Sequence, residues 1–275
     1  MNGSVLFQAK NVNKKIGKIS ILQDINLDIY KGENTAIIGN NGSGKSSLIK
    51  LIAGIYEPTS GVVKRTSTKI AYVPEHFPFH IRFKMMEYLM IVGEISGQPK
   101  KDLYDRIMQY AKMFFIEDFL DIPLKNCSKG TKQKAGLLQA LLSKPDLLLL
   151  DEPLSGLDPE SQFELLHQLM QLKGQTTIVF TAHENMLVDE IADALLELHT
   201  GRLTKSSIRT RSINKMLIKA RLLNKEVFQK NDRFIEIHWE NDSVVTVTVE
   251  ATATDQVLLD MLTNRASILE VKELK

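Results

Sequence analysis

The chain has 275 residues, of which 43% are hydrophobic and 25% are charged, which excludes wholesale disorder and allows one large domain plus a small one. The net charge of +2 excludes a nucleic-acid binder that depends on a global basic field, though not one that uses a local patch. The single cysteine, Cys127, excludes an intramolecular disulfide and indicates a reducing compartment.

The N-terminal part of the chain predicts antiparallel strands that lead into a phosphate-binding loop. Alternation of apolar and polar residues around Leu27 predicts strands within residues 5–35. An apolar strand at 36–38 and an amphipathic helix from 47 to 53 enclose a loop that fits the pattern G-x-x-x-x-G-K-[ST]. A strand, loop and helix in this order aim backbone N–H groups and a positive helix end at one point. The pattern therefore predicts a nucleoside triphosphate site.

The loop supplies the predicted nucleotide ligands. Lys45 would place a charge at the β- and γ-phosphates, and the Ser46 hydroxyl would complete the coordination of Mg²⁺. The residues predicted to bind the nucleotide here are Gly39, Asn40, Asn41, Gly42, Ser43, Gly44, Lys45, Ser46 and Ser47.

A helical segment interrupts the strands that follow. Residues 69–74 predict a short strand with Glu75 just after it, and the pattern is helical from about 83 to 143. The methionines around 85–90 are interpreted either as core or as an adaptable docking face, and the sequence leaves both open.

Two buried strands then end in polar residues. Leu147 to Leu150 reads as a strand buried on both faces and ends in Asp151 and Glu152. A helix over 162–172 and a strand over 176–181 follow, with His183 just past the strand. This alternation of strand and helix, with polar residues at strand ends, is typical of an α/β nucleotide-binding sheet.

The composition shifts after Leu203. Residues 202–233 hold ten Lys or Arg against two acids, which predicts a polar, basic connector. This stretch is interpreted either as a solvated face or as a contact with anionic lipid or a membrane subunit through Arg209 and Arg211. Strands at 234–239 and 244–249, a helix at 257–262 and a strand from 267 predict a small α+β domain.

Two further groups of residues carry chemistry. Asp151 suits Mg²⁺, and Glu152 beside it can polarise the water that attacks the terminal phosphate, unless the pair is an acidic N-cap before Pro153. Ser128 and Gly130 at a helix start form an anion-binding N-terminus, unless they are an ordinary cap.

The order of these segments resembles the ATP-binding-cassette (ABC) ATPases over residues 1–203, with a helical subdomain at about 83–143 and a second region at 204–275. The resemblance implies a P-loop NTPase core of α/β class, with a mixed sheet, an antiparallel subdomain and a helical subdomain. It assigns residues 39–46 to the Walker A loop and 147–151 to the Walker B strand. ATP and Mg²⁺ are the implied cofactors.

The resemblance also implies the other roles. Glu152 becomes the catalytic carboxylate, His183 the switch histidine, and Glu75 a metal ligand at the Q-loop position. Residues 128–131 occupy the signature motif, and 155–158, ending in Asp158, the D-loop. In this family two cassettes pair head to tail, so Ser128 and Gly130 of one chain contact the ATP held by Lys45 of the other, and Asp158 is a further nucleotide-binding residue.

Three positions depart from the family pattern. Ile16 stands where an aromatic residue often stacks on adenine, which removes roughly 1–3 kcal/mol of stacking. Glu75 replaces a glutamine, and Lys129 replaces a glycine of the signature. The Ser-Lys-Gly version resembles cassettes of bacterial exporters whose membrane subunits are encoded separately.

The sequence thus predicts the ATP-hydrolysing subunit of such an exporter, partnered by a second cassette and a transmembrane permease, with no nucleic acid. No basic and then apolar signal and no apolar run of about 20 residues is present, so we expect a cytoplasmic chain, peripheral on the inner face of the membrane. The alternative is a soluble ABC ATPase that acts on nucleic acid or ribosomes.

Overall fold

The structure is a computed structural model that describes residues 4–66, 69–78, 80–182, 185–206, 215–222, 233–241 and 243–274. It divides into two compact units, Met1–Arg209 and Thr210–Lys275.

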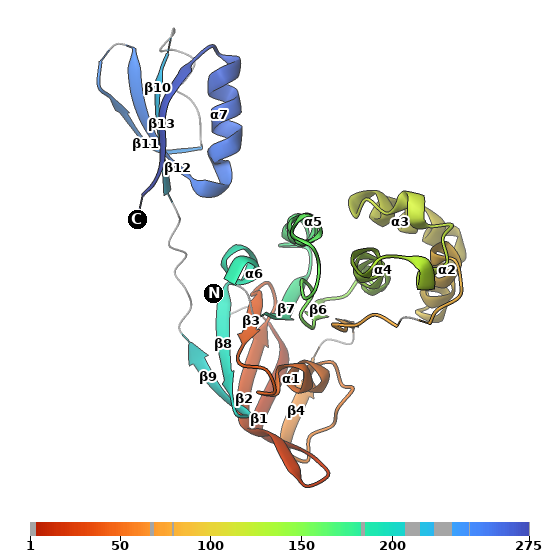
Figure 1. The fold of residues 1–275 in the computed structure, drawn as a ribbon. Helices are drawn as coiled ribbons and strands as arrows, with labels where there is room; N and C mark the ends of the chain where they lie inside the picture. Colours follow the sequence, from red (N-terminus) through yellow and green to blue (C-terminus); the bar gives the residue numbers. More distant parts are fainter. Residues whose placement is uncertain are drawn as a thin grey trace. The chain divides into compact units, whose positions relative to one another are not determined.

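A six-stranded mixed sheet is the centre of the first unit (Figure 1). Its order is β5-β6-β7-β3-β8-β9, in which β5 to β8 are parallel to their neighbours and β9 is antiparallel to β8. The strands are β3 (Thr35–Ile38), β5 (Ile70–Val73), β6 (Leu147–Leu150), β7 (Thr177–Thr181), β8 (Ala194–His199) and β9 (Arg202–Ser206).

The sheet separates two hydrophobic cores, and β6 shows why its sequence is a run of leucines. Leu148 and Leu150 pack into the core that the helical segment shares, whereas Leu147 and Leu149 pack into the core around α1 (Lys45–Ile52). All four side chains are buried. A strand covered on both faces cannot alternate polar and apolar residues, so this run belongs to the interior of a sheet.

A second, antiparallel sheet has the order β2-β1-β4 and is formed by β1 (Val5–Ile16), β2 (Ile19–Tyr30) and β4 (Ser60–Arg65). Its inward residues, among them Ile25 and Ile29, join the core around α1. The alternation seen in the sequence is thus confirmed as one buried and one solvated face.

The helical segment lies between β5 and β6 in the chain, as predicted. It contains α2 (Met85–Ile95), α3 (Lys100–Met113), α4 (Lys129–Leu142) and two short 3₁₀ turns, Glu117–Phe119 and Leu124–Asn126. Met85 is fully buried, and Met86 and Met90 are half-buried against the same core. Met85 therefore serves as core packing, and Met86 and Met90 pack against the same core while part of each side chain remains exposed. The helices α5 (Pro159–Gln171) and α6 (Asn185–Ile191) complete the unit.

The second unit is a four-stranded antiparallel sheet with one helix on it. Its order is β11-β12-β10-β13, from β10 (Lys215–Arg221), β11 (Phe234–Trp239), β12 (Val244–Glu250) and β13 (Ser267–Leu274). A 3₁₀ turn, Ala251–Ala253, precedes α7 (Thr254–Thr263), whose Val257 and Met261 are buried with Ile218 and Val247 of the sheet. The predicted α+β class is confirmed for this unit.

The basic stretch is only in part a connector. Its first residues form β9 of the main sheet, and residues 215–221 form β10, in which Ile218 and Ala220 are buried and Lys219 is not. Alternation along the strand places the charged side chains on the solvated face. The basic composition therefore did not indicate the strand that these residues form. Arg209 and Arg211 lie outside the described residues. None of the described helices is long and apolar enough to cross a membrane.

Candidate nucleotide and catalytic site

The loop between β3 and α1 holds a buried lysine. Gly44 precedes the helix with φ 105°, a conformation that L side chains rarely adopt, and a Cβ there would lie 3.1 Å from the Ile21 carbonyl oxygen. The Lys45 side chain is 5% exposed, and its Nζ donates to the Gly39 carbonyl at 3.0 Å and the Asn40 carbonyl at 3.5 Å. The loop thus folds around the ammonium.

Asp151, at the end of β6, collects three hydroxyl groups from three other segments. Ser46 Oγ and Thr181 Oγ1 each donate to its Oδ1 at 3.0 Å, and the Tyr72 hydroxyl donates to its Oδ2 at 3.3 Å. Burial and the neighbouring Asp151 charge raise the pKa of Tyr72 well above its usual range, so its hydroxyl keeps the proton it donates. The carboxylate is 3% exposed, and these bonds define its orientation.

Glu152 follows in an unusual backbone conformation. Its φ is 47°, in the left-handed region, and its N–H donates to Thr181 Oγ1 at 2.8 Å. The carboxylate Oε1 lies 3.4 Å from Lys45 Nζ. A non-glycine residue held in this region is a form of strain that concentrates at functional sites. The turn directs Glu152 toward the phosphate loop rather than along the sheet.

A cavity of about 620 Å³ opens beside these residues, in the size range of small-molecule sites. It brings together phosphate-loop residues, both glutamates and one loop serine. Its lining residues are Ile21, Asn41, Gly42, Gly44, Lys45, Ser46, Ser47, Glu75, Glu152 and Ser155.

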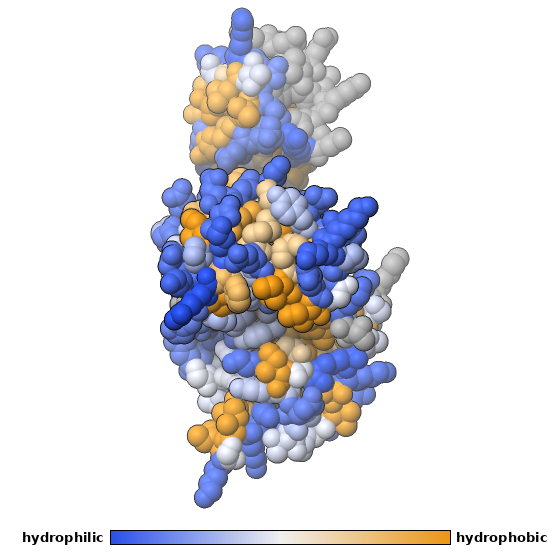
Figure 2. Space-filling view, turned by 90° about the vertical axis from the view of Figure 1, so that its right-hand side faces the viewer, coloured by the Kyte–Doolittle hydropathy of each residue, from blue (hydrophilic) through white to orange (hydrophobic). Residues whose placement is uncertain are grey.

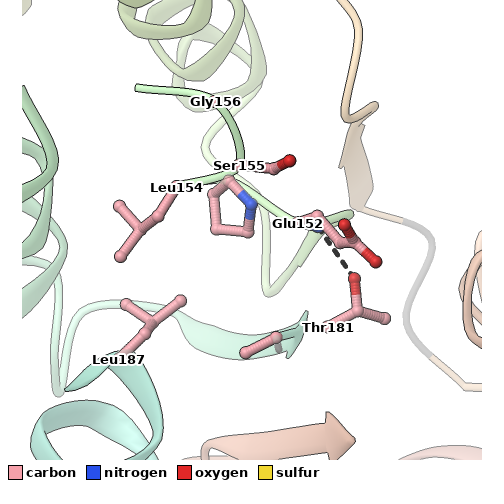
Figure 3. A pocket seen from close by; sticks show the side chains of 8 residues that line it. Glu152, Leu154, Ser155, Gly156, Thr181 and Leu187 are labelled. Atoms are coloured by element: carbon pink, nitrogen blue, oxygen red, sulfur yellow. Dashed lines mark hydrogen bonds between the residues drawn. The ribbon is translucent and has the colours of Figure 1, made fainter. Parts of the chain in front are cut away.

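A smaller pocket of about 170 Å³ lies on the other side of Glu152. Figure 3 shows Leu154 and Leu187 facing one another at its apolar end, while the Glu152 carboxylate points away from them, beside Thr181. Leu154 of the loop and Leu187 of α6 are both buried at this end.

The residues present fit a magnesium ion in part. Ser46 Oγ and Asp151 offer the oxygen ligands that Mg²⁺ prefers. Within the described ranges no group of three or more His, Cys, Asp or Glu could hold a metal ion. Magnesium commonly takes only one or two protein ligands and fills the rest with phosphate oxygens and water, so this donor set suits a metal that arrives with a nucleotide.

Ser128 and Asp158 lie outside the lining of the large cavity and cap helices. Ser128 Oγ accepts from the Thr131 N–H at 3.0 Å at the start of α4, and Asp158 Oδ1 accepts from the Ser161 N–H at 3.0 Å at the start of α5. The bonds from Ser161 lower the pKa of Asp158 below its ordinary value. Both residues are exposed, and a Cβ on Gly130 would lie 3.3 Å from Ser161 Oγ. The two helix starts are therefore neighbours.

The three departures from the family pattern have distinct places. Ile16 is 48% exposed at the tip of the β1–β2 hairpin and does not line the cavity, which Ile21 does. Glu75 Oε1 accepts from Ser155 Oγ at 3.5 Å inside the cavity. Lys129 Nζ donates to the Ser155 carbonyl at 2.6 Å. His183 lies outside the described residues.

Sequence reasoning missed Tyr72 and Thr181 as site residues. Each ends or nearly ends a strand that lies beside β6, at the same sheet edge as Asp151. The signal was available, since polar residues at the carboxyl ends of adjacent parallel strands meet.

Comparisons with known proteins show which family the chain resembles. A family model described as ABC transporter matches residues 22–155. The chain is 30% identical over 196 residues to an uncharacterized ABC transporter ATP-binding protein, MJ1023, of Methanocaldococcus jannaschii, covering 71% of this chain and 74% of that protein. It is also 30% identical over 213 residues to the methionine import ATP-binding protein MetN 2 of Enterococcus faecalis, covering 71% and 62%.

Among solved structures, cbiO1 from Clostridium perfringens, part of the ABC transporter complex cbiONQ, is similar with a TM-score of 0.65 and 25% identity, over 74% of this chain and 88% of that one. The chain spans between 64% and 74% of the length of the first curated relatives it matches.

Proposed function

The chain belongs to the ATP-binding subunits of ABC transporters, a family of ATPases, and from that premise we propose that it drives a separately encoded membrane exporter. Two copies, or this chain and a related one, would close head to tail on ATP and open after hydrolysis. The observation that carries this is the division of the site. The cavity is lined by the phosphate loop, Glu75, Glu152 and Ser155, while Ser128, Gly130 and Asp158 stand apart from it at helix starts.

Each half of the site has its own chemistry. Lys45 and the loop N–H groups bind the β- and γ-phosphates, and the phosphates replace carbonyl oxygens and Glu152 as partners of the ammonium. Glu152 orients the attacking water and accepts its proton. Ser46 and Asp151 would hold Mg²⁺, which neutralises charge on the phosphates.

The other half arrives from the second chain. A helix N-terminus favours negative charge, and α4 carries no acidic residue in its first turn. Ser128 and Gly130 can therefore approach a triphosphate held by the partner's loop. Because each chain supplies half of each site, a single chain would hydrolyse ATP poorly.

The membrane subunit would dock on the helical segment. Figure 2 looks onto the side of the molecule where α2 and α3 lie and shows separate hydrophobic patches among hydrophilic residues. Phe83, Ile91 and Ile95 are 54%, 43% and 79% exposed and are the candidates for this contact, whereas Met85 is buried. The docking would keep the chain peripheral on the inner face of the membrane.

The direction of transport rests on the signature sequence. Its Ser128-Lys129-Gly130 form resembles exporter cassettes. A relative named for methionine import shares 30% identity, so an import motor of the same build is the alternative within the family.

Glu152→Gln tests whether the chain hydrolyses ATP by the proposed mechanism. We expect turnover to fall at least about a thousandfold, because the amide cannot take the proton, while ATP binding persists and a dimer accumulates in ATP. Light scattering measures the dimer and phosphate release measures turnover. Glu160→Gln, an exposed acid at the start of α5, is the matched control and should turn over normally. Normal hydrolysis by Glu152→Gln would remove Glu152 as the base.

The partner is tested by co-purification with the product of the neighbouring reading frame. A membrane protein with about six apolar spans that stimulates ATPase activity would support the exporter. Recovery with ribosomes or nucleic acid instead would favour the soluble alternative and overturn this proposal.

A further inference from the structure

Lys129 links the start of α4 to the loop that follows Glu152. Its Nζ donates to the Ser155 carbonyl at 2.6 Å, between residues that are 26 positions apart in the chain. The contact therefore joins two segments that fold as separate elements.

The surroundings show that this contact shapes the loop. A cation in the first turn of a helix opposes the helix dipole, and no acidic residue in that turn of α4 compensates it. Gly156, next to Ser155, has φ 64°, and a Cβ there would overlap Lys129 Nζ. The loop thus leaves space for the ammonium. The partial negative charge of the Ser155 carbonyl oxygen stabilises the lysine in the absence of an acidic residue in that turn.

Ser155 connects the Lys129 contact to residues that line the nucleotide cavity. Its Oγ donates to Glu75 Oε1 at 3.5 Å, its N–H donates to the Glu152 carbonyl at 3.0 Å, and the residue lines the cavity. A displacement of the loop would therefore move groups beside both glutamates.

We propose that Lys129 is a positioning residue that holds the 153–158 loop, so that Ser155 and Glu75 keep their places in the chain's own cavity. This inference rests on the proposed function in one respect. Since the start of α4 is the part expected to meet the partner's nucleotide, Lys129 would carry the state of that nucleotide to Ser155. Lysine at this position then couples the two sites of the dimer.

The tether is tested first without nucleotide, by hydrogen exchange of the folded chain. In Lys129→Met the Ser155 and Leu157 amides, which are bonded within the loop, should exchange at least about fivefold faster than in the wild type. Lys129→Arg, which keeps a charged donor, should restore protection. Lys132→Met is the matched control, because Lys132 lies in the same helix and its Nζ donates to the Lys125 carbonyl, away from the loop. Unchanged exchange in Lys129→Met would overturn the tether.

Kinetics test the coupling. We expect Lys129→Met to lower kcat about tenfold with KM for ATP within about twofold, whereas Lys132→Met should leave both near wild type. Ser155→Ala keeps the carbonyl but removes the hydroxyl that meets Glu75, so the double variant should be no slower than the slower single variant. Additive effects, or equal losses in the two methionine variants, would overturn the coupling.

The two failures are distinguishable. If Glu152→Gln forms no dimer in ATP, the proposed function fails, whereas loop exchange in the nucleotide-free chain still decides whether Lys129 holds the loop.

Discussion

The phosphate-loop region, around Lys45, Asp151 and Glu152, and the helix starts at Ser128 and Asp158 differ in burial and in the range of their hydrogen bonds. Around Lys45, Asp151 and Glu152, side chains from β5, β6, β7 and α1 bond to one another over long sequence distances and are largely buried. At Ser128 and Asp158, each side chain bonds to groups in the first turn of the helix that it caps, and each residue is exposed.

The difference shows which half of the site is complete. Buried charges need partners, so the phosphate-loop region must be preorganised by the fold. A helix cap needs no tertiary partner, so the helix starts are stable while facing solvent. On the proposed function, the phosphate-loop region of one chain would bind a nucleotide by itself, and the helix starts of a second chain would complete the site.

Lys45→Ala should have the largest effect of the substitutions in the phosphate-loop region. We expect ATP affinity to fall at least about a hundredfold, because the change removes the phosphate-binding cation and leaves Glu152 facing the phosphates. Titration of a fluorescent ATP analogue measures it. Lys50→Ala, on the same helix but over the Tyr56 ring, is the control and should bind within about twofold of wild type. A loss of less than about tenfold in Lys45→Ala would contradict this account of the loop.

Ser128→Arg should break the exposed region without touching the buried one. In a Glu152→Gln background we expect no ATP-dependent dimer, because a bulky side chain would block the approach of the second chain, while lone-chain ATP affinity stays within about twofold. Ser128→Ala, which loses the cap and about 1 kcal/mol of stability but adds no bulk, separates the two effects. If Ser128→Arg still forms the dimer, the proposal that Ser128 completes the site of the second chain is wrong.

Tyr72→Phe tests whether the hydrogen bonds that orient the buried Asp151 contribute to activity. It removes the donor to Asp151 Oδ2, a bond worth about 1 kcal/mol, so we expect kcat to fall about fivefold and nucleotide binding to need more Mg²⁺. Because the pKa of Tyr72 is raised by burial, the effect should be the same throughout the neutral pH range. Tyr104→Phe, on the exposed face of α3, is the control. Unchanged Mg²⁺ dependence would argue against a role for the hydroxyl.

Asp158→Ala should give the smallest effect, a modestly lower Tm. The hydrogen bonds from Ser161 hold the pKa of Asp158 below its ordinary 3.8, so the ionised carboxylate stabilises the fold above that pH. This contribution is lost as the pH falls through the folded-state pKa. The Tm difference from wild type should therefore be constant above about pH 5 and shrink below pH 4. A difference that persists unchanged into acid would exclude the charge as its source. Asp158→Asn keeps a capping oxygen but loses the charge, so its Tm should fall less than that of Asp158→Ala, and its difference from wild type should disappear below pH 4.

Local patterns predicted most of the first unit. The alternation in β1 and β2, the apolar run of β6 and the phosphate loop are all short-range signals, because the period of burial is set by the strand or helix itself. Strand β10 was missed because its lysines and arginines outweighed two buried apolar positions. Strand β10 lies inside its sheet, between β12 and β13, but its densely charged solvated face hides the period of its buried face.

The sequence by itself determined which chemistry the chain carries: a loop for phosphates, two acids after a buried strand, and a helix start at Ser128, in an order that resembles one family. The tertiary structure alone decided which groups meet. Tyr72 and Asp151 are 79 residues apart, Ser46 and Asp151 are 105 apart, and Lys129, at the start of α4, bonds to Ser155 in a loop 26 residues away. Such contacts follow from the order of strands in the sheet, which depends on how all the buried faces pack together and on no single local pattern.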